Sequence, residues 1–157
     1  MGRALILVIA VGVMIGLAWP SGEKSLASAG AVQSGEPRET VLERQSNGHF
    51  YTHAKINDKE LVHFVVDTGA TVVVLTIDDA RRLGIPVNPA EFEVVGEGAS
   101  GPVRGKDIML DSVEVDGKRV ENVPAAVLEG ANLSLLGQAY LSRMGQVQMS
   151  GDYMVLK

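Results

Sequence analysis

Beyond about residue 48, the chain alternates between short apolar runs and clusters of turn-forming residues. Two such runs, HFYTHAKI (His49 to Ile56) and ELVHFVV (Glu60 to Val66), are separated by the polar residues Asn57, Asp58 and Lys59. Aromatic and β-branched residues on both sides of a short polar turn are typical of a β-hairpin. The pattern therefore predicts two antiparallel strands here.

Two more hairpins are predicted towards the C-terminus. Ile108 to Val115 and Arg119 to Val127 flank the dipeptide Asp116-Gly117, which is a strong turn signal between two strands. The chain closes with a shorter pair of apolar runs, Gln146 to Met149 and Tyr153 to Leu156.

Short helical stretches interrupt these strands at two places. The stretch TIDDARRLG begins at Thr76, which can cap a helix, and has Asp79 at the capping-box position and Gly84 at the C-terminal stop. It follows an apolar run from Thr71 to Leu75. A second stretch, QAYLSRM, follows the run LSLLG from Leu133 to Gly137. Many short strands with one or two short helices predict a compact, mainly β domain.

The N-terminus has a different pattern. Ala4 to Trp19 is a run of sixteen residues without a charge, preceded by Arg3. A helix of this length approaches the thickness of a bilayer, so residues 1–20 are expected to form a membrane anchor. A cleaved secretory signal is the alternative, with Ala27-Ser28-Ala29 as the cleavage pattern. In both cases Arg3 holds the start in the cytoplasm and the rest crosses the membrane.

Residues 21–47 are rich in Ser, Gly, Ala and Glu and have no sustained apolar period. This composition predicts a flexible stalk. We therefore expect one folded domain over residues 48–157.

Composition excludes several functional classes. The chain has 14 basic and 19 acidic residues and a net charge of −5, which gives no electrostatic footprint for nucleic acid. It has no cysteine, so disulfides, thiolate nucleophiles and Cys-ligated zinc are excluded. His49 and His53 would lie about 13 Å apart on one strand, and with His63 they do not predict a metal site. Ser100 does not stand in a GxSxG motif. No cofactor is expected.

The candidate for catalysis is Asp67, within the triplet Asp67-Thr68-Gly69. Apolar residues lie on both sides of it, and a carboxylate in such surroundings is costly unless it is hydrogen-bonded or shares a proton. Thr68 can supply a hydroxyl, and Gly69 permits a close approach of the backbone in conformations that other residues avoid. Two such carboxylates brought together can hydrolyse an amide, one deprotonating a water while the other protonates the carbonyl oxygen. A carboxylate that merely caps a turn is the alternative.

These residues resemble the retropepsin-like aspartic peptidases, particularly a bacterial membrane-anchored, single-domain subgroup. The active-site motif of that family is matched by Val65 to Ala70, and its second motif by Leu135, Leu136 and Gly137. The resemblance covers Gly48 to the C-terminus. It implies the single lobe of an acid-protease barrel, which pairs with a second copy.

Several roles follow from the resemblance. Asp67 would activate water across a dimer axis, Thr68 would hydrogen-bond to the partner's loop, and Gly69 would keep the loop tight, with Ala70 completing the motif. The segment VVGEGASGPV would be a flap that closes over substrate; its glycines are Gly96, Gly98 and Gly101. An ordinary exposed loop is the alternative for this segment.

One residue departs from the retroviral pattern. An arginine directly follows the second-motif glycine in retroviral members, whereas Gln138 stands there in this chain. Arg143 comes later and is a candidate substitute.

Two functions remain open at this point. The first is a homodimeric aspartic endopeptidase acting on peptides or proteins, held at the bacterial inner membrane with its domain in the periplasm, or released there after signal cleavage. The second is a non-catalytic module of the same fold that binds an extended peptide by strand addition.

Overall fold

The computed structural model describes residues 36–98 and 101–157. The expected anchor or signal segment (1–20) and residues 21–35 of the expected stalk lie outside these ranges. Within them, no helix is long and apolar enough to cross a membrane.

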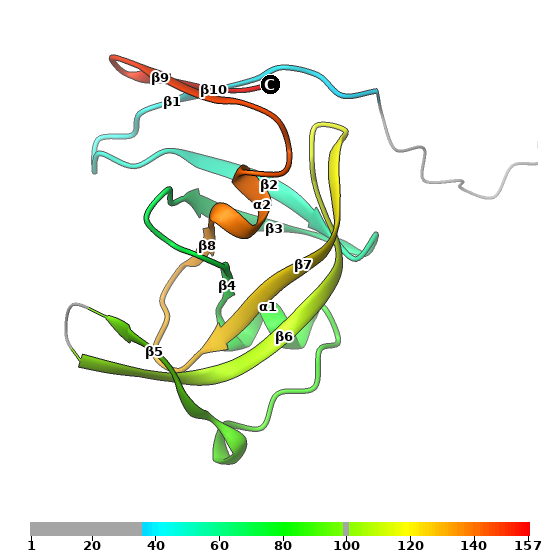
Figure 1. Ribbon diagram of the computed structural model, residues 1–157, viewed down its shortest axis with the longest axis vertical. Helices are drawn as coiled ribbons and strands as arrows, with labels where there is room; N and C mark the ends of the chain where they lie inside the picture. Colours follow the sequence, from blue (N-terminus) through cyan, green and yellow to red (C-terminus); the bar gives the residue numbers. More distant parts are fainter. Residues whose placement is uncertain (1–35, 99–100) are drawn as a thin grey trace, which may run out of the picture. The chain divides into compact units, whose positions relative to one another are not determined.

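Six strands close into a barrel, and the fold is mainly β, as predicted. β2 pairs with β6 as well as with β3, and this additional pairing closes the ring. A seventh strand, β5, continues the sheet from the free edge of β6 (Figure 1). In sheet order the strands are β2 (Tyr51–Ile56), β3 (Glu60–Val66), β8 (Ser134–Leu136), β4 (Val73–Leu75), β7 (Lys118–Leu128), β6 (Gly101–Val115) and β5 (Glu93–Gly98).

The hairpins predicted from local sequence are confirmed. β2 and β3 pair antiparallel around a turn in which Asn57 and Asp58 have φ of 51° and 56°. β6 and β7 pair around Asp116 and Gly117, with φ of 48° and 81°. Two successive residues with positive φ match the right-handed twist of the flanking strands, so these turns set the register of both hairpins.

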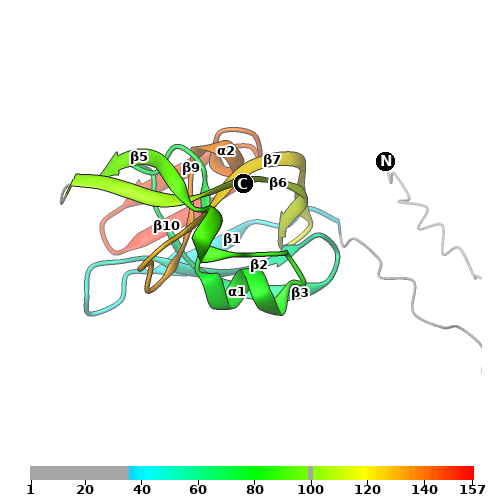
Figure 2. The same ribbon diagram turned by 90° about the horizontal axis from the view of Figure 1, so that it is seen from below.

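Two short helices cover parts of the barrel, α1 (Ile77–Arg82) and α2 (Gln138–Leu141), and α1 is seen in front in Figure 2. As predicted, the Thr76 hydroxyl caps α1 by accepting a hydrogen bond from the Asp79 N–H at 3.0 Å. Gly84 ends it with φ of 72°. A 3₁₀ turn, η1 (Pro89–Glu91), leads from α1 into β5.

The barrel interior is filled by side chains from the inward faces of its strands, among them Ile56, Phe64, Leu75, Leu110, Val113 and Leu136. Tyr140 of α2 is fully buried, and its hydroxyl donates a hydrogen bond to the Lys118 carbonyl at 2.8 Å. Burial raises the pKa of the Tyr140 phenol. The core thus ties α2, which directly follows the second motif, to the start of β7.

A second, three-stranded sheet lies beside the barrel and joins the two ends of the domain. Its strand order is β1 (Thr40–Glu43), β10 (Tyr153–Leu156) and β9 (Val147–Ser150), with antiparallel pairing throughout. The last two strands are the predicted C-terminal hairpin.

β1 corrects the expected domain boundary. It lies inside residues 21–47, the segment predicted to be a flexible stalk. Thr40 and Leu42 are buried, and Thr40 donates a hydrogen bond from its hydroxyl to Asp116 at 2.6 Å. Polar composition concealed this strand, because only alternate residues of TVLE face the core.

Candidate active site

The two sequence motifs of the site meet because β8 lies between β3 and β4. β8 runs parallel to β3, with Val66 beside Leu136, and antiparallel to β4, with Val74 beside Leu135. The loop after β3 therefore passes over the end of β8. There the Asp67 N–H donates a hydrogen bond to the Leu136 carbonyl at 3.1 Å.

Asp67 lies in a tight turn at the end of a buried strand. Its side chain is half-buried, while Thr68 and Gly69 are exposed. The carboxylate accepts a hydrogen bond from the Gly69 N–H at 2.9 Å, and the Ala70 N–H donates to the Asp67 carbonyl at 3.3 Å. A rigid, hydrogen-bonded base therefore presents one carboxylate at the surface.

One expectation for this loop needs correction. Gly69 does not have a positive φ; instead, a Cβ at this position would lie 3.2 Å from the Asp67 carboxylate oxygen, so the glycine leaves room for that oxygen. The Thr68 hydroxyl makes no hydrogen bond to Asp67 within the described part of the chain, and its hydrogen bond to the partner's loop stays a prediction.

The backbone at Gly137 lies very close to the loop that follows Asp67. A Cβ there would lie 2.2 Å from the Val72 carbonyl oxygen and 2.7 Å from that of Ala70. The close approach lets α2 begin directly beneath the loop, so that the N–H groups of Gln138 and Ala139 donate to the Ala70 and Thr71 carbonyls at 2.8 and 2.9 Å. The glycine of the second motif is thus a steric requirement of the site.

Gln138, the departure from the retroviral pattern, also braces the loop. Its side-chain amide donates a hydrogen bond to the Thr68 carbonyl at 2.9 Å. Arg143 has a different role, since its guanidinium donates to the carbonyls of Glu121 and Asn122 on β7, at 2.7 and 3.0 Å. Within one chain, therefore, the residue that directly follows the glycine still contacts the active-site loop.

The segment considered as a flap forms a β-hairpin. β5 and β6 pair antiparallel with Gly98 opposite Gly101, and residues 99–100 between them lie outside the described ranges. The hairpin projects as an arm in Figure 2. A register shift between Val94 and Gly96 makes Val95 an extra residue on β5. A bulge of this kind can redirect a side chain, and Val95 lies on the wall of the cleft described next.

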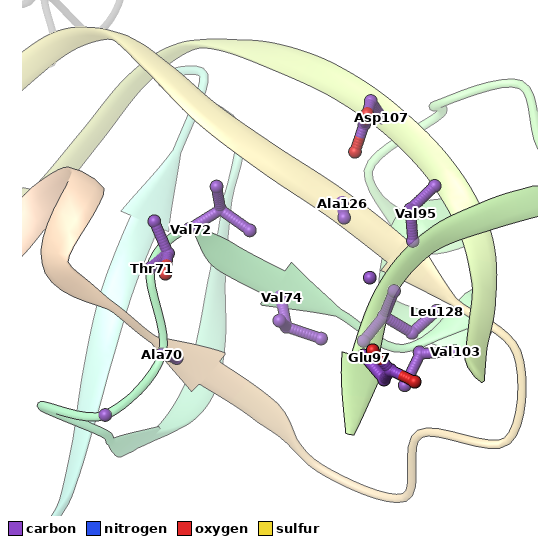
Figure 3. Close-up of a pocket in the computed structure, with 12 residues that line it drawn as sticks. Ala70, Thr71, Val72, Val74, Val95, Glu97, Val103, Asp107, Ala126 and Leu128 are labelled. Carbon is purple, nitrogen blue, oxygen red and sulfur yellow. The ribbon is translucent and has the colours of Figure 1, made fainter. Parts of the chain in front are cut away.

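A cleft of about 550 Å³ separates the Asp-Thr-Gly loop from this hairpin. In Figure 3, Ala70 and Thr71 lie on one side and Val95, Glu97 and Val103 on the other. The rest of the lining consists of Val72, which directly precedes β4, together with Val74 of β4, Asp107 of β6, and Ala126 and Leu128 of β7. Gly69 and Gly96 complete the lining.

Sequence reasoning did not find the residues on β6 and β7 that line this cleft. One signal was available, a glycine inside a strand, which often marks a close approach of backbones. A Cβ at Gly105 would lie 2.4 Å from the Val127 carbonyl oxygen and 2.7 Å from a methyl of Leu128. Gly105 thus lets the base of the hairpin lie directly on β7.

Two of the three histidines lie side by side across the β2–β3 pair. His53 lies opposite His63 in the β2–β3 register, with ring centroids 4.8 Å apart, and Tyr51 stacks on His63 at 5.1 Å. Residues 36–98 and 101–157 contain no group of three or more His, Cys, Asp or Glu side chains arranged to hold a metal ion.

A six-stranded barrel that carries an Asp-Thr-Gly loop over a second glycine motif, with a hairpin across a cleft, defines one lobe of an aspartic peptidase. A sequence model of the family described as "gag-polyprotein putative aspartyl protease" matches residues 52–143. The chain therefore belongs to the retropepsin-like aspartic peptidases.

Similar proteins support this assignment. A retropepsin-like aspartic protease from Rickettsia conorii has 30% sequence identity and a TM-score of 0.64, with 76% of this chain and 90% of that one covered. The EIAV protease in complex with the inhibitor HBY-793 has 22% identity and a TM-score of 0.51, with 64% and 91% covered; at this identity the likeness concerns the fold alone.

Two curated relatives are themselves uncharacterized proteins. One, from a Sinorhizobium species, is 33% identical over 122 residues and aligned over 76% of this chain and 52% of its own length. The other, from Rickettsia prowazekii (strain Madrid E), is 33% identical over 124 residues, with 78% and 53% covered. The chain thus spans about half the length of the curated relatives that it matches.

Proposed function

We propose that the protein is an aspartic endopeptidase whose active site forms when two copies bring their Asp67 carboxylates together. The observation that carries the proposal is the position of the single Asp-Thr-Gly loop. Thr68 and Gly69 are exposed on it, and it borders a cleft that is closed on the other side by a hairpin. A half-buried carboxylate in a loop that borders a substrate-sized cleft is half of the required chemistry.

The second half is another carboxylate. Two carboxylates within a few ångströms cannot both ionise, so one keeps a proton while the other is charged. The charged one deprotonates a water molecule, and the protonated one donates to the carbonyl oxygen of the scissile peptide bond. The chain contains one Asp-Thr-Gly triplet, so a second copy supplies the partner.

Asp67→Asn tests this mechanism. The variant keeps the size and shape of the side chain but cannot act as the base, so cleavage of a mixed peptide library should fall at least about a hundredfold. Asp111→Asn, an exposed aspartate on β6 outside the cleft, is the matched control and should keep parental activity. Circular dichroism should show the parental fold for both. An Asp67→Asn protein that cleaves as fast as the parent would exclude the mechanism.

The homodimer is tested separately by sedimentation. At low micromolar concentration we expect a dimer, or activity that rises with the square of protein concentration when the dimer is weak. A strictly monomeric species with full activity would contradict the two-carboxylate scheme. Attachment to a membrane would favour the dimer, because confinement to a surface raises the effective concentration.

We also propose that the N-terminal segment holds the domain at the periplasmic face of a bacterial inner membrane. The support is the sequence alone, sixteen uncharged residues from Ala4 to Trp19 behind Arg3. Fractionation of cells and N-terminal sequencing of the mature chain distinguish this anchor from a signal cleaved near Ala29. Recovery of the intact chain from the cytosol would exclude both.

A non-catalytic peptide-binding module is the second candidate. It is favoured by β5, which ends the seven-stranded sheet and so offers a free edge to an added strand. Incubation of the protein with a peptide library over a range of pH separates the two candidates. Measurable binding without cleavage at any pH would favour the module.

A further inference from the structure

The charged residues that line the cleft are all acidic. Of the twelve residues that line the cleft, Glu97 and Asp107 carry charge, and none is a lysine or arginine. Figure 3 shows the two carboxylates well apart, with Asp107 at one margin of the lining and Glu97 at the other. A ligand in the cleft therefore meets a negative group on two sides.

Neither carboxylate has a cationic partner within the described ranges, although basic residues lie nearby on β6. Lys106 pairs with Glu91 at 3.3 Å, and Arg104 pairs with Glu129 at 3.2 Å. Arg104 also donates to the Phe92 carbonyl at 2.8 Å. The cations of this strand are thus engaged by residues outside the cleft, and Glu97 and Asp107 remain open to a ligand.

Apart from Thr71, the other side chains of the lining are aliphatic. The largest are Val72, Val74, Val95, Val103 and Leu128, and Ala126 lies among them. Lysine and arginine have long apolar stems with a charged end, and they bury the stem against apolar surface while the end reaches a polar margin. An acidic side chain would be repelled here, and a short polar one would leave the aliphatic wall unfilled.

We propose that this cleft is a specificity pocket for a lysine or arginine side chain of the peptide substrate, with Asp107 and Glu97 as its specificity-determining residues. This deepens the proposed function, on which it rests for the position of the peptide. The pocket itself is defined by the cleft beside the Asp-Thr-Gly loop, and the two carboxylates decide which side chain it prefers.

The expected preference is moderate, because both carboxylates are exposed. Ion pairs open to solvent contribute about 0.2–1 kcal/mol each, which corresponds to a preference of about two- to thirtyfold for the two together. Added salt screens such pairs and should reduce the preference. A twofold dimer presents two equal clefts, so basic residues are expected on both sides of the scissile bond.

The test begins with cleavage sites from a mixed peptide library, aligned at the scissile bond. At the position with the strongest basic preference, three peptides are then compared that carry lysine, norleucine or glutamate. Norleucine has the apolar stem of lysine without its charge. We expect kcat/KM to follow the order lysine, norleucine, glutamate, and the ratio of lysine to norleucine to fall at high salt.

Matched variants assign the preference to the cleft. Asp107→Asn and Glu97→Gln should each lower the ratio of lysine to norleucine, and the double variant should bring it close to one. Asp111→Asn removes the same charge from the same strand outside the cleft and should leave the ratio unchanged. An equal loss in all three variants would indicate a general charge effect and overturn the proposal.

The failure of this proposal is distinguishable from failure of the proposed function. Cleavage without a basic preference would overturn the specificity pocket and leave the peptidase in place. If no peptide is cleaved, fluorescence anisotropy with labelled lysine and glutamate peptides decides: stronger binding of the lysine peptide that is lost in Asp107→Asn supports the pocket. Equal binding, or no binding, of the two peptides overturns it.

Discussion

At the scale of single residues, the site depends on how closely two backbones approach at Gly137. The carbonyls of Ala70 and Val72 occupy the space where any other residue would have its Cβ. These carbonyls belong to the loop that follows Asp67, so the shape of the loop and the identity of residue 137 are linked. Gly96 differs, since nothing lies within 4 Å of its Cβ position.

This difference gives a paired prediction for Gly137→Ala and Gly96→Ala. The first variant must push the loop away from α2, so its free energy of unfolding in urea should fall by about 1–3 kcal/mol, and peptide cleavage should fall with it. The second should change stability by less than about 0.5 kcal/mol. Equal stability of the two variants would show that the loop can move away from residue 137 without loss of free energy of unfolding.

At the scale of elements, α1 is linked to β8, the strand that carries the second motif. The buried Ser134 hydroxyl donates to the Asp79 carboxylate at 2.5 Å and accepts from the Thr76 N–H at 3.1 Å. Arg82 also donates to Asp79. Burial raises the pKa of Asp79, but the hydrogen bonds from Ser134 and Arg82 outweigh it, and the net pKa is lowered.

Because the pKa of Asp79 is lowered, the contribution of this link to stability depends on pH. The ionised Asp79 stabilises the fold above the ordinary pKa of 3.8, and this contribution is lost as pH falls through the lowered value of the folded protein. The stability advantage of the parent over Asp79→Asn should be about 1 kcal/mol at neutral pH and should shrink in acid. Urea titrations between neutral and acid pH measure it.

Two serine variants control this prediction. Ser134→Ala should remove part of the same pH dependence, because the hydroxyl that favours the ionised carboxylate is gone. Ser142→Ala removes an exposed hydroxyl that donates to the Gln138 carbonyl at 2.6 Å and should leave the pH dependence of stability unaltered. The link between α1 and β8 would be refuted by identical acid profiles for both.

The elements that could be predicted from sequence are those held by local signals. The β6–β7 hairpin follows from Asp116-Gly117, and the start of α1 from Thr76. Other features depend on partners distant in the chain, such as the insertion of β8 beside β3 and β4 and the pairing of β2 with β6. The same holds for the site. The Asp67 loop could be predicted because it carries a sequence motif, whereas the bulge at Val95 and the place of Asp107 in the cleft lining depend on the register of the sheet.

At the scale of the whole molecule, β1 is held to the barrel by a buried cation. Lys118 is nearly fully buried; its amine donates to the Thr40 hydroxyl at 2.9 Å and to the Arg38 carbonyl. Burial lowers the pKa of this amine. The β6–β7 turn, the first strand and the C-terminal hairpin therefore depend on one another for satisfied hydrogen bonds.

Truncation tests this dependence. A chain that starts at Glu36 should be as stable as one that keeps the whole N-terminal segment, whereas a chain that starts at Gly48 loses β1. The loss exposes the neighbours of Leu42 and leaves Lys118 without its acceptors, so unfolding in urea should require about 3 kcal/mol less. Equal stability of the two truncated chains would show that β1 does not contribute to the stability of the domain.

The place of β8 has a consequence for the order in which the protein is made. β3, the Asp67 loop and β4 leave the ribosome well before Ser134, yet β8 must enter between β3 and β4 to supply the carbonyl that holds Asp67 and the glycine over which the loop is shaped. A nascent chain that ends before Ser134 carries the complete first motif without a formed site. The site that we propose for hydrolysis therefore cannot form before β8 has been synthesised.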